Sequence, residues 1–255
     1  MSIVIEHLNY VYMQGGPYET RALDDVSLTI HDGEFIGLIG HTGSGKSTLV
    51  QHLNGLILPT SGKITVDGMD LAEKGTDRRA IRRRVGLVFQ YPENQLFEET
   101  VAKDIAFGPK NLGLGEEEID RRVRTAMRRV ALDYDKLAQR SVFELSGGQM
   151  RRVAIAGVLA MEPQTLVLDE PCAGLDPRGR EEILGLISDL HRESGATIVM
   201  VSHSMDDVAA LAERVIVMNH GKVAMDGTPR EIFSRGEELR AIGLDVPQAV
   251  ELAQK

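Results

Sequence analysis

The sequence contains no tryptophan, a single cysteine and no apolar run long enough to cross a membrane. Cys172 has no partner for an internal disulfide, which indicates a reducing compartment such as the cytoplasm. The longest apolar stretch, Val153–Met161, is interrupted by Gly157 and has about half of the ~20 residues that a transmembrane helix needs. Residues Met1–Glu6 lack the charged-then-apolar pattern of a signal peptide. Any association with a membrane is therefore expected to be peripheral.

Positive charge is also in short supply. The chain carries 29 Lys and Arg against 38 Asp and Glu, a formal net charge of −9. A general nucleic-acid binder normally presents a basic face, so this balance argues against nucleic acid as a partner. Short basic runs such as Arg82–Arg84 and Arg121–Arg122 are most simply explained as solvated helix faces beside acidic residues. The alternative is contact with a protein partner or with lipid head groups.

The distribution of apolar residues predicts the fold class. With only 9 prolines and no low-complexity segment, 255 residues form one large domain, or one domain with appendages. Short apolar runs alternate with helical patterns, which predicts an α/β fold with a mainly parallel sheet. The runs are rich in Val, Ile and Leu, as expected of strands covered on both faces. The predicted strands are Phe35–Ile39, Val85–Phe89, Leu166–Leu168, Thr197–Val201 and Val215–Met218.

Three regions depart from this alternation. Near the N-terminus, Ile3–Val11, Ala22–Ile30 and Lys63–Val66 are separated by turn-prone glycines and predict antiparallel strands. Between residues 113 and 139 the pattern becomes helical and charged, which predicts a helical insert. After Pro229 the tail predicts short helices with a weak core.

A glycine-rich segment after the first buried strand predicts a phosphate-binding loop. Residues 40–47 fit G-x-x-x-x-G-K-[ST], follow the strand Phe35–Ile39 and precede a helical run, which is the context that the motif requires. Backbone amides and the helix N-terminus then face the anion. Lys46 is expected to neutralise phosphate charge and Ser47 to ligate Mg²⁺, whereas His41 and Thr42 should contribute only backbone. The predicted binding residues are Gly40, His41, Thr42, Gly43, Ser44, Gly45, Lys46, Ser47 and Thr48.

Two carboxylates end a later apolar strand. Asp169 and Glu170 follow Thr165–Leu168, and neighbouring residues at a strand end point in different directions. Asp169 is therefore predicted to hold Mg²⁺ and Glu170 to act as general base for an attacking water. His203 follows the strand Thr197–Val201, and ligands of such sheets lie beyond the carboxyl ends of the strands. The sequence places His203 beside the γ-phosphate.

A second candidate phosphate site follows Leu145. Ser146 can cap the helix after it, and Gly147 and Gly148 leave the first amides of that helix open to an anion. Gln149 completes the motif Leu145–Gln149. One active site needs only one such helix start, so the second is expected to complete the site of a neighbouring subunit.

With these motifs in this order, the chain resembles the ATPase subunits of ABC transporters from about Ile3 to Lys255, with Leu145–Gln149 as the family signature. The resemblance implies that Tyr12 stacks on adenine, although Tyr10 and Tyr18 are close by. It implies that Gln90 contacts Mg²⁺ and senses a membrane subunit. The resemblance also makes Ala173–Asp176 the D-loop and His203 the switch histidine, and Cys172 is expected to be a small apolar residue rather than a redox sensor.

Several further segments are similar to one branch of this family, the energy-coupling factor transporters, which import vitamins and cobalt or nickel. These segments are Val88–Thr100, Asp104–Asn111 and Gly157–Pro163. The loop Gly15–Arg21 and the stretch Gln51–Gly55 resemble the second ATPase subtype of that branch. The resemblance implies a complex of this chain with a first-subtype ATPase, a transmembrane coupling protein and a membrane substrate-binding protein. Residues 90–100 are expected to line the groove for the coupling protein.

The expected organisation follows from this resemblance. An α/β P-loop NTPase core with an N-terminal antiparallel β subdomain should fill residues 1–235 and contain a helical subdomain at about 92–160. Residues 236–255 are expected to begin a C-terminal helical dimerisation extension, cut short if the chain is truncated. The expected activity is hydrolysis of ATP with Mg²⁺ at the cytoplasmic face of a membrane. The rivals are another type of ABC importer, an ABC ATPase of DNA repair or translation, a P-loop kinase and a regulatory module without hydrolysis.

Overall fold

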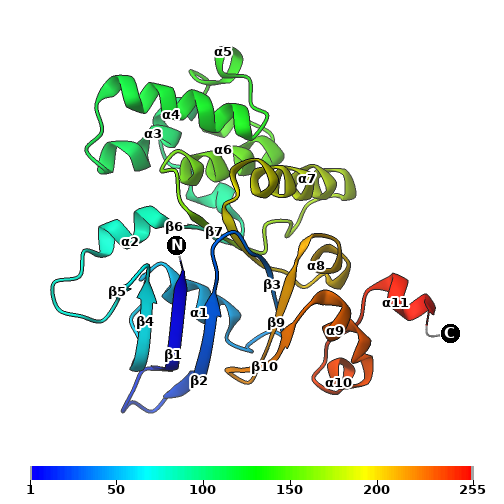
Figure 1. Ribbon diagram of the computed structural model, residues 1–255. Coiled ribbons are helices and arrows are strands. Elements are labelled where there is room, and N and C mark those ends of the chain that lie inside the picture. The colour runs from blue at the N-terminus through cyan, green and yellow to red at the C-terminus, as the bar shows by residue number, and fades with distance from the viewer. Residues whose placement is uncertain (1, 254–255) are drawn as a thin grey trace.

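The computed structural model describes residues 2–253 and contains two sheets with helices around them (Figure 1). The larger sheet has six strands in the order β10-β9-β3-β8-β7-β6, and only the β10–β9 pair is antiparallel. Its strands are β3 (Phe35–Ile39), β6 (Val85–Val88), β7 (Thr165–Asp169), β8 (Thr197–Val201), β9 (Arg214–Asn219) and β10 (Lys222–Gly227). The predicted α/β fold with a mainly parallel sheet is confirmed.

The smaller sheet is antiparallel and has the order β2-β1-β4-β5. Its strands are β1 (Ile3–Tyr12), β2 (Thr20–Ile30), β4 (Ser61–Val66) and β5 (Met69–Asp70). Side chains of the large sheet alternate between two cores, as the period of a strand requires. Ile36 and Leu38 of β3 pack toward the antiparallel sheet, whereas Phe35 and Ile39 pack toward the helical side. The large sheet is therefore covered on both faces.

The helices divide between the sheets and a separate helical subdomain. Helices α1 (Lys46–Leu53) and α2 (Arg78–Arg84) precede the subdomain in sequence. The subdomain, at the top of Figure 1, contains η1 (Pro92–Gln95), α3 (Val101–Asn111), α4 (Glu116–Arg129), α5 (Tyr134–Leu137), η2 (Val142–Glu144) and α6 (Gly147–Leu159). The chain then continues through α7 (Pro177–Ser194), α8 (Met205–Leu211), α9 (Pro229–Ser234), α10 (Gly236–Ala241) and α11 (Gln248–Ala253). No helix within residues 2–253 has both the length and the apolar character needed to span a bilayer.

Two expectations about the fold were wrong. Arg122 is not part of a solvated helix face, because its side chain is 7% exposed and contacts Glu118 at 2.6 Å and Glu162 at 2.9 Å. The C-terminal tail does not have a weak core: Phe233 and Leu239 are buried in the main hydrophobic core. The tail packs because α9 lies against β9, β10 and α8. Residues 254 and 255 of the predicted extension lie outside the described residues.

Strand β10 was missed by the sequence analysis. It pairs with β9 through a two-residue turn in which His220 has φ 46° and Gly221 has φ 77°. Positive φ at both central residues identifies a turn that matches the twist of a hairpin. The dipeptide His220-Gly221 after an apolar strand was the available signal for β10.

Candidate active site

The phosphate-binding loop lies between β3 and α1, as its sequence context predicts. At two of its positions, steric constraints allow only glycine. Gly40 has φ 154°, and a Cβ there would lie 2.4 Å from the Met218 carbonyl oxygen. Gly45 has φ 104°, and its Cβ would lie 2.7 Å from the Ala22 carbonyl oxygen. Real Cβ atoms do not approach oxygen so closely, and L side chains rarely adopt these angles. The loop therefore requires glycine at both positions.

Lys46 is held beneath this loop. Its side chain is buried, and Nζ donates to the carbonyl oxygens of Gly40 at 2.6 Å and His41 at 3.1 Å. Burial lowers the pKa of Lys46, while the charges of Glu170 and Asp169 oppose that change. The cation is thus fixed by two backbone acceptors on one side and faces two carboxylates on the other.

The imidazole ring of His41 makes contacts within the protein. Its Nε2 lies 3.1 Å from Oδ1 of Asn219, and its Nδ1 lies 2.8 Å from the carbonyl oxygen of Thr42. The His41 side chain thereby ties the loop to the end of β9, and its predicted backbone role toward the phosphates stays a prediction.

The acidic pair lies where the sequence predicts it, at the carboxyl end of β7. Asp169 is the last residue of the strand and Glu170 follows with φ 52°, held by a hydrogen bond from its N–H to the Val201 carbonyl at 3.1 Å. Oε1 of Glu170 lies 3.3 Å from Nε2 of His203. Burial raises the pKa of Asp169, and the Ser47 hydroxyl and Lys46 partly offset this. The three predicted catalytic and metal-binding elements therefore meet at one edge of the sheet.

Glu170 has the electrostatics of a proton acceptor near neutral pH. Burial, with a smaller contribution from Asp169, raises the pKa of Glu170 to about 7. Burial and the charge of Lys46 lower the pKa of His203, so the imidazole is mainly neutral at pH 7. The two side chains thus form a close polar contact rather than a full ion pair. A carboxylate with a pKa close to the working pH suits general base catalysis.

The elevated pKa predicts a pH-dependent stability difference. The pKa of the Glu170 carboxyl is about 7 in the folded protein and exceeds the ordinary glutamate value of 4.5. The native state therefore loses stability as pH rises from about 4.5 to 7, by at most roughly 3 kcal/mol. Glu170→Gln removes this loss, so its advantage in thermal midpoint over the nucleotide-free wild type should grow between pH 5 and 8. The exposed Glu237→Gln serves as control, and an advantage constant with pH would contradict the assignment.

A pocket of about 500 Å³ joins these groups. Most of the predicted nucleotide-binding and catalytic residues line it, together with four residues that the sequence analysis did not place in the site, three at the start of β2 and Val201 of β8. The lining residues are Tyr12, Thr20, Arg21, Ala22, Thr42, Gly43, Gly45, Lys46, Ser47, Thr48, Gln90, Asp169, Glu170, Val201 and His203. Three predicted binding residues, Gly40, His41 and Ser44, do not line this pocket, and the Ser44 side chain is fully buried. The segment Gly15–Arg21, whose last two residues begin β2, had been noted only as a subtype marker.

Tyr12 is the tyrosine that the structure places at this pocket. Its hydroxyl lies 3.2 Å from Oγ1 of Thr48, and its ring is 40% exposed. The ring meets the Tyr10 ring edge-on at 4.8 Å, and Tyr10 in turn packs edge-on against the buried His52. Tyr18 is 78% exposed and does not line the pocket. Among the three candidates, Tyr12 therefore has the position for stacking on a base.

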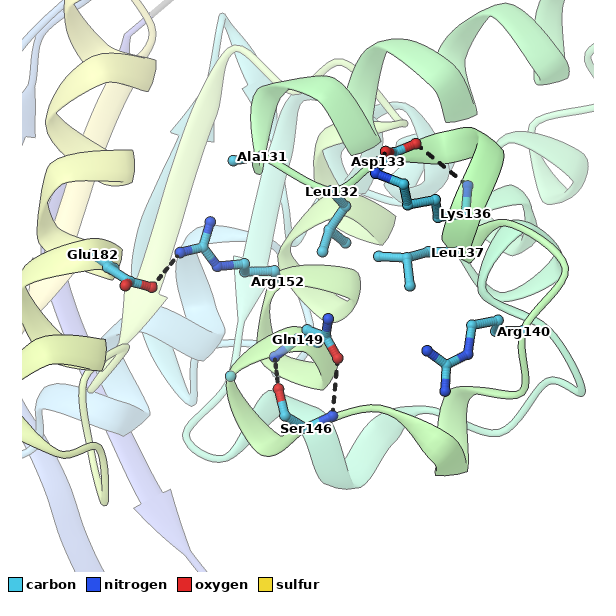
Figure 2. A pocket seen from close by; sticks show the side chains of 11 residues that line it. Ala131, Leu132, Asp133, Lys136, Leu137, Arg140, Ser146, Gln149, Arg152 and Glu182 are labelled. Carbon is cyan, nitrogen blue, oxygen red and sulfur yellow. Dashed lines mark hydrogen bonds and ion pairs between the residues drawn. The ribbon is translucent and has the colours of Figure 1, made fainter.

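The signature segment forms a second, separate pocket of about 590 Å³ (Figure 2). Ser146 caps α6: its Oγ accepts from the Gln149 N–H at 3.3 Å, and the Gln149 side chain accepts from the Ser146 N–H at 3.1 Å. Gly148 lines the same pocket, and Arg152 bridges to Glu182 of α7 at 2.7 Å. No residue lines both this pocket and the one at the phosphate loop. The chain therefore has two distinct candidate anion sites.

The phosphate-loop pocket fits a magnesium nucleotide. Oε1 of Glu170 is buried and forms no hydrogen bond in the described part of the chain, although Nε2 of His203 lies 3.3 Å away, so it can still accept from a water or ligand. Ser47, Gln90 and Asp169 supply oxygen atoms, which suit Mg²⁺. Within residues 2–253 no group of three or more His, Cys, Asp and Glu could hold a metal by itself. Such a donor set suits a cation that also takes phosphate oxygens.

Comparisons with known proteins agree with this geometry. Residues 23–173 match the ABC transporter family. The energy-coupling factor transporter ATP-binding protein EcfA2 of Clostridium tetani is 62% identical over 252 residues, covering 99% of this chain and 88% of that protein. EcfA2 of Symbiobacterium thermophilum is also 62% identical, over 255 residues, covering 100% of this chain and 88% of that protein.

Solved structures show the same likeness. A structure of cbiO1 from Clostridium perfringens, part of the ABC transporter complex cbiONQ, has a TM-score of 0.81 and 41% identity, covering 99% of this chain and 98% of that one. A dimeric ATP-binding cassette in a post-hydrolysis state, bound to ADP and Pi, has a TM-score of 0.79 and 29% identity, covering 89% of this chain and 99% of that one.

Proposed function

We propose that this chain, which belongs to the ABC transporter family, is an ATP-binding and ATP-hydrolysing subunit of an energy-coupling factor importer for vitamins or transition-metal ions. Its sequence similarity to EcfA2 proteins extends over almost its whole length. The proposal places it peripherally at the cytoplasmic face of the membrane. The transported solute would be selected by another chain.

One observation carries this proposal: the signature glycines are open. A Cβ at Gly147 or Gly148 would meet no heavy atom within 4 Å, and neither residue has positive φ. Glycine destabilises a helix by roughly 0.5–1 kcal/mol relative to alanine, and within residues 2–253 no steric reason requires it here. Gly148 lines a pocket together with the capping residue Ser146, so this open space leaves room for an approaching molecule. A nucleotide held by a second ATPase subunit, bound to Ser146, Gly147, Gly148 and Gln149, fits that space.

The residues of the other pocket would bind and orient the nucleotide. ATP with Mg²⁺ supplies the anhydride bond to be cleaved and a cation that neutralises its charge. Tyr12 would stack on adenine, the loop amides of residues 40–48 and Lys46 would hold the phosphates, and Ser47, Asp169 and Gln90 would hold Mg²⁺.

Glu170 and His203 would act on the water. Glu170 would accept a proton from the water while the water oxygen bonds to the γ-phosphorus. The bond between the γ-phosphorus and the oxygen that it shares with the β-phosphate would then break, giving ADP and phosphate. His203, whose Nε2 lies 3.3 Å from Oε1 of Glu170, would donate its one N–H toward the γ-phosphate once the nucleotide is bound. Positioning and charge neutralisation would supply most of the rate enhancement.

A third pocket, of about 690 Å³, supports docking on a membrane protein. It lies between the helical subdomain and α2, and residues 95–97 of the predicted coupling segment line it. Phe97 and Phe107 are 58% and 44% exposed there and pack edge-on at 4.8 Å. Exposed aromatic pairs of this kind mark interaction surfaces. The proposed occupant is a helix of the transmembrane coupling protein, in a complex that also holds a first-subtype ATPase and a membrane substrate-binding protein.

Purification of the tagged chain from membranes tests the proposal. We expect integral membrane proteins and a second ATPase to be recovered with it. Phe97→Glu should lose at least about nine-tenths of the membrane proteins yet keep the second ATPase, because a buried charge is costly at such a surface. Tyr18→Glu, which changes an exposed aromatic outside the groove, should leave recovery unchanged. A monomer that hydrolyses ATP at full rate and is never recovered with membrane proteins would refute the proposal.

A further inference from the structure

Arg151 is a charged side chain of α6 that is buried between η1 and the turn that follows Glu170. Only 1% of the residue is exposed, the least among the buried charged residues of the described chain. It lies in α6, one turn after the signature glycines. A buried guanidinium is costly unless its N–H groups are paired, so its partners show what it holds.

One edge of the guanidinium binds the segment after Gln90. Nε donates to Oε2 of Glu93 at 3.0 Å and Nη2 donates to Oε1 at 2.8 Å. Two parallel hydrogen bonds fix the orientation of both planar groups. Glu93 belongs to η1, the short helix that leads into the proposed docking groove. The signature helix and this segment are therefore joined rigidly.

The other edge binds the turn that follows Glu170. Nη1 donates to the carbonyl oxygens of Pro171 at 3.0 Å and Ala173 at 2.9 Å. The same turn is closed by a hydrogen bond from the Ala173 N–H to the Glu170 carbonyl at 3.1 Å. A movement of the guanidinium plane would therefore move the backbone that carries the general base.

A second contact joins the same two segments independently. Tyr91 precedes η1 with φ 53°, and a Cβ at Gly174 would lie 3.3 Å from Cε1 of its ring. The ring thus packs directly on the loop that follows the turn. Because two separate contacts join them, the segment after Gln90 and the turn after Glu170 are expected to move together.

We infer that Arg151 is a positioning residue for hydrolysis: its guanidinium transmits the position of the segment around Glu93 to the turn that carries Glu170. The inference rests on the proposed function, since it needs ATP hydrolysis at Glu170. Arg151 forms no hydrogen bond with the nucleotide-binding loop in the described part of the chain, so removing its side chain should slow hydrolysis without weakening nucleotide binding. Four of the five guanidinium N–H groups are used, and no lysine can reproduce that pattern.

The test compares two buried arginines of the helical subdomain. Arg151→Met keeps the aliphatic packing and removes the hydrogen bonds, and Arg122→Met does the same at a site whose guanidinium is paired with Glu118, Glu162 and the Ala160 carbonyl. In the assembled complex, Arg151→Met should lower kcat at least tenfold with KM for ATP changed less than threefold. Arg122→Met should leave both within about twofold, despite a comparable loss of thermal stability.

A fluorescence readout tests the transmission itself. The chain has no tryptophan, so Phe97→Trp places a single reporter two residues after η1. In the isolated chain, ATP should shift its emission in the wild-type and Arg122→Met backgrounds. Arg151→Met should abolish the shift while ATP binding by equilibrium dialysis stays within threefold. If Arg151→Met does not fold, Glu93→Gln should show the same losses, and Arg151→Lys a partial one.

The outcomes separate this inference from the proposed function. Normal kcat and a normal emission shift in Arg151→Met, in a complex that hydrolyses ATP, would overturn the inference alone. Equal effects of Arg151→Met and Arg122→Met would reduce Arg151 to a structural role and also overturn it. A wild-type complex that does not hydrolyse ATP would overturn both.

Discussion

The Glu170→Gln variant is expected to bind ATP as the wild type does and to hydrolyse it about 100-fold more slowly or worse. An amide has nearly the size of a carboxyl group, so the contacts of the side chain with His203 change little. It cannot, however, accept the proton of the attacking water, and general base catalysis contributes roughly 10²- to 10⁴-fold. Because cleavage stops after binding, ATP should hold two subunits together, and size-exclusion chromatography with ATP should show accumulated dimers.

The matched control is Glu213→Gln, which removes a carboxylate that is 64% exposed and lies outside the pocket. It should hydrolyse ATP at the wild-type rate and should not accumulate dimers. Turnover by Glu170→Gln within a few-fold of the wild type would show that another group accepts the proton, and the assignment of the base would then be wrong.

Gly148→Ala is expected to uncouple stability from activity. Its new methyl group meets no heavy atom within 4 Å, so the fold should be unchanged or gain up to roughly 1 kcal/mol from the better helix former. Hydrolysis in the assembled complex should nevertheless fall at least about tenfold, because the methyl group occupies the space proposed for the phosphates of the partner's nucleotide. Thermal unfolding and steady-state phosphate release measure the two quantities on the same preparation.

Gly185→Ala is the control for this substitution. Gly185 lies in α7, is exposed, and likewise has open space around its missing Cβ. It should gain stability in the same way and hydrolyse ATP normally. If Gly148→Ala also hydrolysed normally, the open glycines of α6 would need another explanation and the composite site would lose its main support.

The parts of the site that could be predicted are those in which the functional residues directly follow a strand that the sequence reveals. The loop of residues 40–47 and the pair Asp169 and Glu170 each follow a recognisable apolar strand, and the strand end fixes where they point. Parallel strands β3, β7 and β8 then bring them and His203 to the same sheet edge. The roles given to these residues still await the experiments above.

The parts that were not predictable depend on partners far apart in the sequence. Arg151 and Glu93 are separated by 58 positions, and Arg122 of α4 meets Glu162 in the loop that follows α6. In the sequence these arginines look like any others in a charged helix, since burial is decided by what packs over them. His41 is a similar case, because Asn219 reaches it only through the pairing of β3 with β9.

The cap at the start of α6 leaves one hydrogen uncommitted. Oγ of Ser146 accepts from Gln149, whereas no hydrogen bond donated by the hydroxyl itself is found between residues 2 and 253. A serine hydroxyl can accept and donate at the same time. An incoming anion can therefore accept a hydrogen bond from the Ser146 hydroxyl while the first turn of α6 stays intact. The N-terminus of α6 would then stay folded through each round of subunit association and release, so repeated turnover would not require this helix to unfold and refold.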